Sequence, residues 1–498
     1  MKRIAYLLLA LIVCGSAVAQ IQIPGGPIRP PIPPAKQRTK PKAKARPKKT
    51  AQQQVKYYDV TFTCNTPDAD LYIDGDYVGD ANISWTLKAG SHAVKVITDY
   101  YNDYSTTVNV SSNKKSFDIN LTEKTDAESQ YQLGLNYYDG RSGFPKNYAS
   151  AVEHLSNAAK QGHTDAQIIL AWCYEKGHGV KKDIKKALAW CTEAANLGNS
   201  LAQLNLGIWY TAGQVLPKND VEAAKWFRKA AEQGDSTGQC LLACFYYVGI
   251  GVKQDYNEAI KWIKKAVDQG DASAIDFLGV CYLRGHGVEQ DYTEAVKCFK
   301  QAASQGFSSS AYSLGRCYYY GWGVPQNLSE ALNWFRKAAE QGNLDAQSDL
   351  GFCLLKFGTP QDYPEAIKWI QNAADKGNAS AQDTMGQCYL TGKGFAQDYD
   401  KAMYWYKKAA DQGYASSQRN LGYFLLEGIG TRANHDEAVK WFRAAAEQED
   451  AEAQYYMGYC YEKGQGVKKN KNEAVKWYQK AAKQDNANAK DALKRLGY

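Results

Sequence analysis

From about residue 127 to the C-terminus, apolar residues recur with the spacing of amphipathic helices, and the pattern returns about every 36 residues. GVKQDYNEAIKWIKKAVDQGDASA at 251–274, for example, returns as GVEQDYTEAVKCFKQAASQGFSSS at 287–310. Each repeat is predicted to form two helices, A and B, joined by a glycine-containing loop, because glycine tolerates positive φ. A small residue, here called the anchor, recurs in helix A of ten repeats: Gly134, Ala171, Gly207, Ala243, Gly279, Gly315, Gly351, Gly386, Gly422 and Gly458.

Helix B of every repeat is predicted to begin at an Asp or Asn, residue types that favour the N-cap position. A Glu follows three residues later in seven repeats, which is the pattern of a capping box. The predicted N-cap residues are Asn147, Asp183, Asn219, Asp255, Asp291, Asn327, Asp362, Asp398, Asn434 and Asn470. Because one helix pair cannot bury its apolar face alone, ten consecutive pairs predict an α-solenoid with one continuous core.

Residues 55–122 follow a different pattern, in which apolar and polar residues alternate and Val, Ile, Tyr and Thr are frequent. A period of two with this composition predicts β-strands. Asp74-Gly75 is a hairpin turn signal, and Ala89-Gly90 marks a second turn. The chain is therefore predicted to be mainly α, with a small antiparallel β-sandwich before the solenoid of residues 127–498.

Residues 1–19 have the pattern of a signal peptide. Lys2 and Arg3 precede an apolar run at 4–13, and small residues at 17–19 offer a cleavage site. This run is too short to span a bilayer, and we expect no transmembrane segment elsewhere. Cys14 is an alternative lipid attachment site, although the residue before it, Val13, is larger than lipidation favours. Residues 20–54 hold eight of the 14 prolines and are predicted to be a disordered Pro/Lys-rich linker.

The net charge of +8 belongs to the N-terminal segment. Residues 1–54 carry eleven Lys and Arg and no Asp or Glu, so the remaining residues hold 49 basic against 52 acidic side chains, a balance of −3. A nearly neutral body gives no reason to expect nucleic-acid binding. The basic run from Lys36 to Lys49 is predicted either to be a solvated tether or to contact an anionic envelope surface.

Twelve cysteines in an exported protein raise the question of disulfides. Six of them occupy one repeated position, two residues after the anchor, and neighbouring repeats lie roughly 10 Å apart, beyond disulfide reach. These six cysteines, Cys173, Cys281, Cys317, Cys353, Cys388 and Cys460, are predicted to be small core residues. Cys173 with Cys191, and Cys281 with Cys298, could each bridge the two helices of one repeat.

No pattern of catalytic or metal-binding residues stands out. His178 and His286 occupy equivalent loops three repeats apart, roughly 30 Å at about 10 Å per repeat, so they cannot share a metal ion. The sequence has no HExxH motif, phosphate-binding loop or nucleophile elbow. We therefore predict no catalytic residues, no metal site and no cofactor.

The residue directly after each anchor should point away from the core side of helix A. Nine residues of this row are the candidate partner-binding residues: Leu135, Trp172, Ile208, Val280, Arg316, Phe352, Gln387, Tyr423 and Tyr459, with Cys244 as the tenth position. A largely apolar row on a solvent-facing surface favours a concave groove for a protein or peptide partner. The alternative is that these side chains are half-buried in packing between repeats.

The β-segment resembles the PEGA domain, a bacterial extracytoplasmic β-module. The resemblance rests on TPDADLYIDGDYVGD at 66–80 and LKAGSHAVKV at 87–96, although Ala81-Asn82-Ile83 departs from the usual Thr-Pro-Leu. It implies residence in the envelope or at the cell surface, and no chemistry.

Residues 127–498 are similar to the Sel-1-like repeat family, relatives of the tetratricopeptide repeats. The recurring elements are Leu-Gly-x-x-Tyr, Gly-x-Gly-Val, Asp-Tyr-x-Glu-Ala and Trp-Phe-x-Lys-Ala-Ala. This resemblance implies a right-handed α-solenoid that serves as an adaptor or scaffold for other proteins. Two departures concern helix B, where His154 and Cys298 replace the usual tryptophan. A third concerns the loop of the seventh repeat, where Gly358 is not followed by the second loop glycine.

We expect an exported, non-enzymatic scaffold that binds a protein or peptide through the helix A face of the solenoid. The β-module and basic linker would position it in the cell envelope, so a periplasmic, envelope-associated or extracellular location is expected. A second hypothesis is an architectural envelope protein that binds wall polymer. A third, suggested by cysteine-rich relatives of these repeats, is a hydrolase acting on wall peptides or β-lactams, although the sequence offers no nucleophile–base pair.

Overall fold

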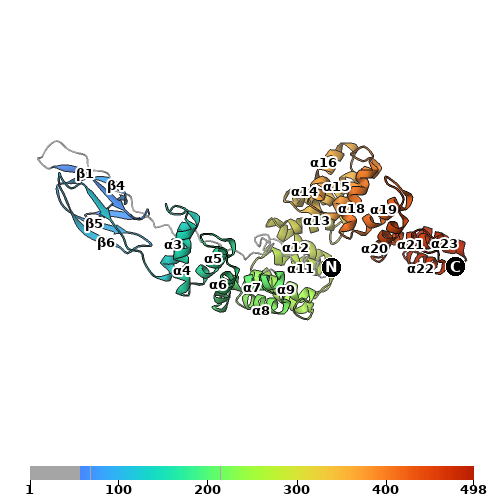
Figure 1. Cartoon of the computed structure of the whole chain (residues 1–498), viewed down its shortest axis with the longest axis horizontal. Helices are drawn as coiled ribbons and strands as arrows, with labels where there is room; N and C mark the ends of the chain where they lie inside the picture. Colours follow the sequence, from blue (N-terminus) through green and yellow to red (C-terminus); the bar gives the residue numbers. More distant parts are fainter. Residues whose placement is uncertain (1–55, 68, 214) are drawn as a thin grey trace. The chain divides into compact units, whose positions relative to one another are not determined.

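The computed structural model describes residues 56–67, 69–213 and 215–498. The predicted signal peptide, the predicted linker and the basic run from Lys36 to Lys49 lie outside the described residues. The chain divides into two compact units, and the division falls between Asp271 and Ala272. Figure 1 colours the elements along the sequence, from the strands in blue to the last helices in red.

Two β-sheets form the N-terminal module of the first unit (Figure 1). The strands are β1 (Tyr57–Cys64), β2 (Asp70–Ile73), β3 (Asp76–Asp80), β4 (Ile83–Lys88), β5 (Gly90–Ile97), β6 (Tyr104–Val110) and β7 (Ser116–Ile119). One sheet has the order β4-β1-β7 and the other β3-β2-β5-β6. The prediction of an antiparallel sandwich is wrong at one pairing, since β7 lies parallel to β1. The chain crosses from the sheet of β6 to the sheet of β7. Because β7 is not joined to β1 by a hairpin, the two strands can pair in parallel.

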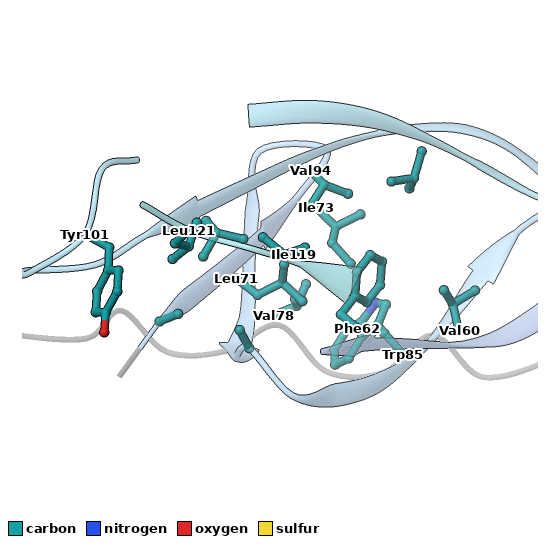
Figure 2. Close-up of a cluster of buried hydrophobic side chains, with 14 of the residues drawn as sticks. Val60, Phe62, Leu71, Ile73, Val78, Trp85, Val94, Tyr101, Ile119 and Leu121 are labelled. Atoms are coloured by element: carbon teal, nitrogen blue, oxygen red, sulfur yellow. The ribbon is translucent and has the colours of Figure 1, made fainter. Parts of the chain in front are cut away.

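The core of the β-module lies between the two sheets (Figure 2). Phe62 of β1 and Trp85 of β4 meet Leu71 and Ile73 of β2 in one buried cluster. The predicted hairpin turn joins β2 to β3, and both of its residues have positive φ, 51° at Asp74 and 89° at Gly75. These signs are those of the turn whose twist matches flanking strands, which explains why Asp-Gly stands there.

Eight helices follow in the first unit, and they form four helix pairs. They are α3 (Ala127–Asp139), α4 (Tyr148–Lys160), α5 (Thr164–Lys176), α6 (Ile184–Asn196), α7 (Ser200–Ala212), α8 (Asp220–Glu232), α9 (Ser236–Val248) and α10 (Tyr256–Asp268). Odd-numbered helices are helix A of their repeat and even-numbered helices are helix B.

The second unit continues the same alternation. Its elements are α11 (Ala272–Arg284), α12 (Tyr292–Ser304), α13 (Ser308–Tyr320), α14 (Leu328–Glu340), α15 (Leu344–Phe357), η1 (Pro360–Asp362), α16 (Tyr363–Asp375), α17 (Ala379–Thr391), α18 (Tyr399–Asp411), α19 (Ala415–Glu427), α20 (His435–Ala446), α21 (Ala451–Lys463), α22 (Lys471–Ala482) and α23 (Ala487–Leu496). None of the helices in the described part of the chain has the length and apolar character needed to cross a membrane.

The anchor glycine allows helices A and B of one repeat to approach closely. A Cβ atom built on Gly422 would lie 2.8 Å from ring atoms of Phe442, and the anchors Gly315, Gly386 and Gly458 face aromatic rings in the same way. The tryptophan of helix B is buried at Trp262 and Trp405 and half-buried at Trp441. The next residue, Phe442, is the one that is fully buried. Helix B thus packs through both positions, and the second is the more deeply buried.

Nine of the ten predicted N-cap side chains accept a backbone hydrogen bond at the start of helix B. The prediction is wrong at Asp362, whose side chain does not cap α16. Its carboxylate accepts hydrogen bonds from the backbone N–H (2.7 Å) and the hydroxyl (3.0 Å) of Thr359 instead. The seventh repeat has a loop one residue shorter than the others, and the short helix η1 takes up the residues that elsewhere lead into the N-cap.

The cysteines support the prediction of core residues. Cys173, Cys281, Cys317, Cys353, Cys388 and Cys460 are all buried. Neither possible bridge, Cys173 with Cys191 or Cys281 with Cys298, is formed among the described residues.

Candidate functional site

In the first unit, the predicted binding row is largely used for packing. Leu135, Ile208 and Cys244 are buried, and Trp172 is half-buried. Leu135 belongs to a core cluster against which Trp172 packs, so neighbouring residues of the row cover one another. Leu135 and Ile208 therefore present no surface to a partner in this structure, as the packing alternative expected.

In the second unit, the same row reaches solvent. Val280, Arg316 and Tyr459 are half-buried, whereas Phe352, Gln387 and Tyr423 are exposed. The exposed fractions of Phe352 and Tyr423 are 37% and 38%, high values for aromatic side chains on a helix. The part of the row that can contact a partner is therefore concentrated on α15, α17 and α19.

Two residues of the row line a cavity of about 330 Å³ between α15 and α17. The full lining comprises Phe352, Leu355, Lys356, Thr384, Gln387, Cys388, Thr391 and Lys393. Its floor is apolar, since Leu355 and Cys388 are buried, and its rim carries two lysines. A cavity of this size with an apolar floor and a few polar groups has the usual character of a small binding site.

The polar groups of this cavity differ in how far they are engaged. The Thr384 hydroxyl donates to the Ser380 carbonyl at 2.9 Å, and the Thr391 hydroxyl donates to the Gln387 carbonyl at 2.8 Å. Burial raises the pKa of the Cys388 thiol to about 12, so this sulfur is not a ready nucleophile. The Gln387 amide and the two lysines are left as the groups that can meet a ligand.

The cavity is lined in part by α15, the helix that precedes the irregular loop of the seventh repeat. In regular repeats the second loop glycine lies against the backbone that begins helix B of the preceding repeat, as Gly323 does at Tyr292. The seventh repeat lacks this glycine, and the loop of the eighth repeat places Gly394 against the side chain of Ile367. The local departure from the repeat pattern therefore changes how the loops pack beside α15 and α17.

An aromatic surface continues from the cavity onto α13 and its following loop. The surface consists of Tyr292, Tyr319, Tyr320, Trp322, Phe352 and Phe357, and all six belong to the second unit. Ring centroids lie 6.3 Å apart for Tyr292 and Trp322, 4.5 Å for Trp322 and Tyr320, 4.9 Å for Tyr320 and Tyr319, and 6.3 Å for Tyr319 and Phe357.

Cations hold this aromatic surface together. The Lys356 ammonium lies 5.4 Å from the ring centre of Phe352 and 5.1 Å from that of Phe357. The Arg316 guanidinium lies 5.6 Å from the ring centre of Trp322 and 5.8 Å from that of Tyr320. Contiguous exposed aromatic side chains of this kind mark interaction sites in soluble proteins.

Sequence reasoning found part of this site and missed the rest. It singled out Arg316, Phe352 and Gln387, but it missed Lys356 and Lys393, which face the cavity from positions that vary among repeats. It also missed Tyr320 and Phe357, of which 52% and 48% are exposed. The signal that could have found the surface is the loop Gly321-Trp322-Gly323, where a half-buried tryptophan replaces the His, Ile, Lys or Gln of other repeats.

The described residues contain no group of three or more His, Cys, Asp or Glu side chains that could hold a metal ion. The histidines make individual contacts instead. His178 Nδ1 is 2.8 Å from the Tyr138 hydroxyl oxygen, and His154 Nδ1 is 3.1 Å from Gln130 Oε1.

The fold and the site describe a helical-repeat protein with an exposed aromatic face in its second unit and a β-module at its start. The Sel1 repeat model matches ten consecutive segments: 127–163, 164–199, 200–235, 236–271, 272–307, 308–343, 344–378, 379–414, 415–450 and 451–486. The chain belongs to the Sel1 repeat family. A second match, to the PEGA domain, covers residues 57–126.

One solved structure supports this assignment. The chain is similar to c5321, described as a protective antigen present in uropathogenic Escherichia coli strains and displaying an SLR fold, with 35% identity over 75% of this chain and 80% of that chain and a TM-score of 0.56. It is also similar to a Sel1 repeat protein from Oxalobacter formigenes, with 32% identity over 49% of this chain and 96% of that chain and a TM-score of 0.45. A comparison with curated proteins gave no significant match.

Proposed function

We propose that this protein is an exported, non-enzymatic scaffold that binds a protein partner through the helix A face of its second unit. Sel1 repeat proteins are generally scaffolds for interactions between proteins. The observation that carries the proposal is the exposed part of the predicted row, where Phe352 and Gln387 line a cavity and Tyr423 stands exposed two repeats beyond Phe352. Leu135, Trp172 and Ile208 have a packing role in this proposal, and Val280, Arg316 and Tyr459 flank the contact.

The location in the cell envelope is part of the proposal. It is supported by the signal-peptide pattern of residues 1–19 and by the match to the PEGA domain. The basic run from Lys36 to Lys49 would add electrostatic contact with an anionic envelope surface.

Site-specific photo-crosslinking in the producing cell tests the proposal. A benzophenone side chain placed at Gln387 should form one dominant crosslink to a partner protein. The same group at Tyr404, which is 53% exposed on helix B of the eighth repeat, serves as the control and should not form it. Phe352→Ala and Tyr423→Ala should each weaken the Gln387 crosslink, whereas Tyr404→Ala should leave it unchanged.

If the crosslinks from Gln387 and Tyr404 are indistinguishable, or if the alanine substitutions on the row have no effect, the helix A face is not the binding face. Circular dichroism of each variant keeps loss of fold apart from loss of contact, since all three substituted side chains are exposed and their removal should cost little stability.

The architectural hypothesis has one observation in its favour. A shallow cavity of about 550 Å³ lies on β2, β5 and β6, and Tyr72, Lys95 and Thr107 help to line it. Co-sedimentation with purified cell wall tests this face, with Lys95→Glu compared against wild type. Point substitution is preferable to removal of the β-module, because Leu133 and Phe144 of the first repeat belong to its hydrophobic core.

A further inference from the structure

We infer that the cavity between α15 and α17 receives an acidic side chain of the partner, presented beside a bulky apolar residue of the same partner segment. This inference rests on the proposed function and adds the chemistry of the partner to it. Lys356 and Lys393 would meet the carboxylate, and the aromatic surface would cover the apolar neighbour.

The charge at the cavity is the first argument. Neither Lys356 nor Lys393 forms an ion pair within the described part of the chain, and no Asp or Glu lines the cavity. Some other lysines of the solenoid are paired, for example Lys476 with Glu473 at 2.6 Å and Lys407 with Asp411 at 2.8 Å. Two cations converging on one cavity without a counter-charge produce a positive local potential that attracts a carboxylate.

Three carboxylates on or next to these helices contact groups other than the two lysines. Asp349 accepts a hydrogen bond from the Tyr312 hydroxyl at 2.9 Å. Asp383 accepts one from the Ser417 hydroxyl at 2.5 Å, and Asp398 pairs with Lys401 at 3.2 Å. Each of these acids is held by a partner other than Lys356 or Lys393.

The apolar part of the site is the second argument. Leu355 and Cys388 form the floor, and the Phe352 ring stands at the edge under the Lys356 ammonium. A free anion would gain little from such a floor, whereas a peptide can place a carboxylate at the lysines and an adjacent apolar side chain on Phe352 and Phe357. The unengaged Gln387 amide can donate to or accept from the backbone of an extended segment.

The seventh repeat differs from its neighbours in the helix that supplies Phe352 and Lys356 to the cavity. Its α15 helix has 14 residues, one more than α13 or α17. Phe357 is its last residue, and Lys356 precedes it. Lys393 occupies the variable position of the next loop, between Gly392 and Gly394. The two lysines thus come from different repeats, and both line the cavity between α15 and α17.

Fluorescence anisotropy of the full-length protein with labelled, end-blocked peptides tests the inference. One peptide carries Glu residues beside Phe, a second has Gln in place of each Glu, and a third has Lys in place of each Glu. The acidic peptide should bind at least tenfold more tightly than the other two, and raising NaCl from about 50 mM to about 300 mM should weaken it several-fold.

Charge reversal assigns the binding to the cavity. Lys356→Glu with Lys393→Glu should weaken the acidic peptide at least tenfold. The control Lys300→Glu with Lys440→Glu makes the same change in net charge on exposed positions of helix B and should have less than a threefold effect. If the acidic peptide fails to bind at about 1 mM, binds no better than the Gln peptide, or ignores the cavity substitutions, the inference is overturned.

The Gln387 crosslink keeps this outcome apart from the proposed function. If the crosslink is lost in Phe352→Ala but persists in the charge-reversed protein, the helix A face binds a partner and only the acidic chemistry is wrong. If it is lost in both, the proposed function and the inference stand together.

Discussion

The anchor residue of helix A sets how closely helix B approaches, and the residue opposite it varies accordingly. Where the anchor is glycine, the opposite position is often aromatic, as with Gly422 and Phe442. Where the anchor is alanine, the equivalent opposite residue is smaller, as with Ala243 and Ile263. Size at one position thus compensates for size at the other, which is the expected behaviour of a closely packed interior.

Gly422→Ala should therefore destabilise the protein by about 1–3 kcal/mol, because the new methyl group meets the Phe442 ring. The double variant with Phe442→Ile should be more stable than the sum of the two single effects by about 1 kcal/mol or more. Amide hydrogen exchange in α19 and α20 measures both. Additive effects would show that the anchor and its opposite residue do not constrain each other.

A buried carboxyl group gives the second unit a dependence on pH. Asp276 of α11 is fully buried and accepts a hydrogen bond of 2.6 Å from the Ser310 hydroxyl of α13. Burial raises its pKa from 3.8 to about 7, while the hydrogen bonds of Ser310 and Ser309 act in the opposite direction. Cys298 also faces this carboxyl group, whose charge adds to the rise of the Cys298 pKa.

Because the folded pKa lies above the unfolded value, the folded state holds the proton more tightly. The stability from this proton is fully present below about pH 4 and is lost as the pH rises through about 7. Asp276→Asn removes the titrating group, so the variant does not share this loss. The free energy of unfolding of the variant minus that of wild type should therefore rise by about 2–4 kcal/mol between pH 4 and pH 8. Thermal unfolding of both proteins at pH 4, 6 and 8 measures the difference. A constant difference in Tm would contradict the burial of this charge.

At the scale of elements, buried glutamines connect each repeat to the next. Gln418, four residues before its anchor, donates through Nε2 to the carbonyl of Ala410 at 3.2 Å, so helix A of one repeat holds the end of the preceding helix B. Its Oε1 accepts a hydrogen bond at 2.8 Å from Gln448, which follows helix B of the same repeat. The same donation to a carbonyl eight residues earlier is made by Gln167, Gln203, Gln239, Gln347, Gln382 and Gln454.

Gln418→Met keeps the volume of the side chain and removes both hydrogen bonds. We expect a loss of about 1–2 kcal/mol, because the Gln448 amide loses a buried acceptor and the Ala410 carbonyl loses its side-chain donor while keeping its backbone hydrogen bond from Gly413. Faster amide exchange at the end of α18 and the start of α19 is the measurement. Gln301→Met, at an exposed position of α12, is the matched control and should have almost no effect.

The sequence predicted those features that a single repeat encodes locally. Anchors, helix pairs and nine of the ten N-caps follow from spacing and residue type within about 36 residues. The role of Asp362 was predicted wrongly because one deletion changes the loop. The deep burial of Phe442 was not predicted because the pattern resolves a helix face only to within one residue. The cavity was not predicted for a different reason. Lys356 and Lys393 belong to different repeats, and their placement around one cavity depends on how those repeats pack together.

At the scale of the whole molecule, the first repeat differs from the others where it meets the β-module. Its loop is one residue longer, and this loop places Phe144 in the hydrophobic core of the β-module, where it lies edge-on to Tyr100 at 6.4 Å. His154 stands where other repeats have tryptophan. Its Nδ1 lies 3.6 Å from Glu123 Oε2, and its ring stacks on that of Tyr137 with the ring centroids 5.4 Å apart. Both departures from the repeat pattern serve this junction.

The junction predicts that the β-module and the first repeat behave as one folded body and are not linked by a free hinge. Lys124 in the connecting segment donates to the Asp99 carbonyl at 2.9 Å, so its side chain is held against the β-module. Phe144→Ala removes a buried ring from the shared core and should raise the rate of tryptic cleavage after Lys124 by about tenfold or more, because the segment opens more often. Phe307→Ala, which removes an equally buried ring from the second unit, should leave cleavage at this site unchanged. Rapid cleavage of the wild-type protein at Lys124, at a rate that neither substitution alters, would mean that the module hinges freely and that Phe144 does not hold it.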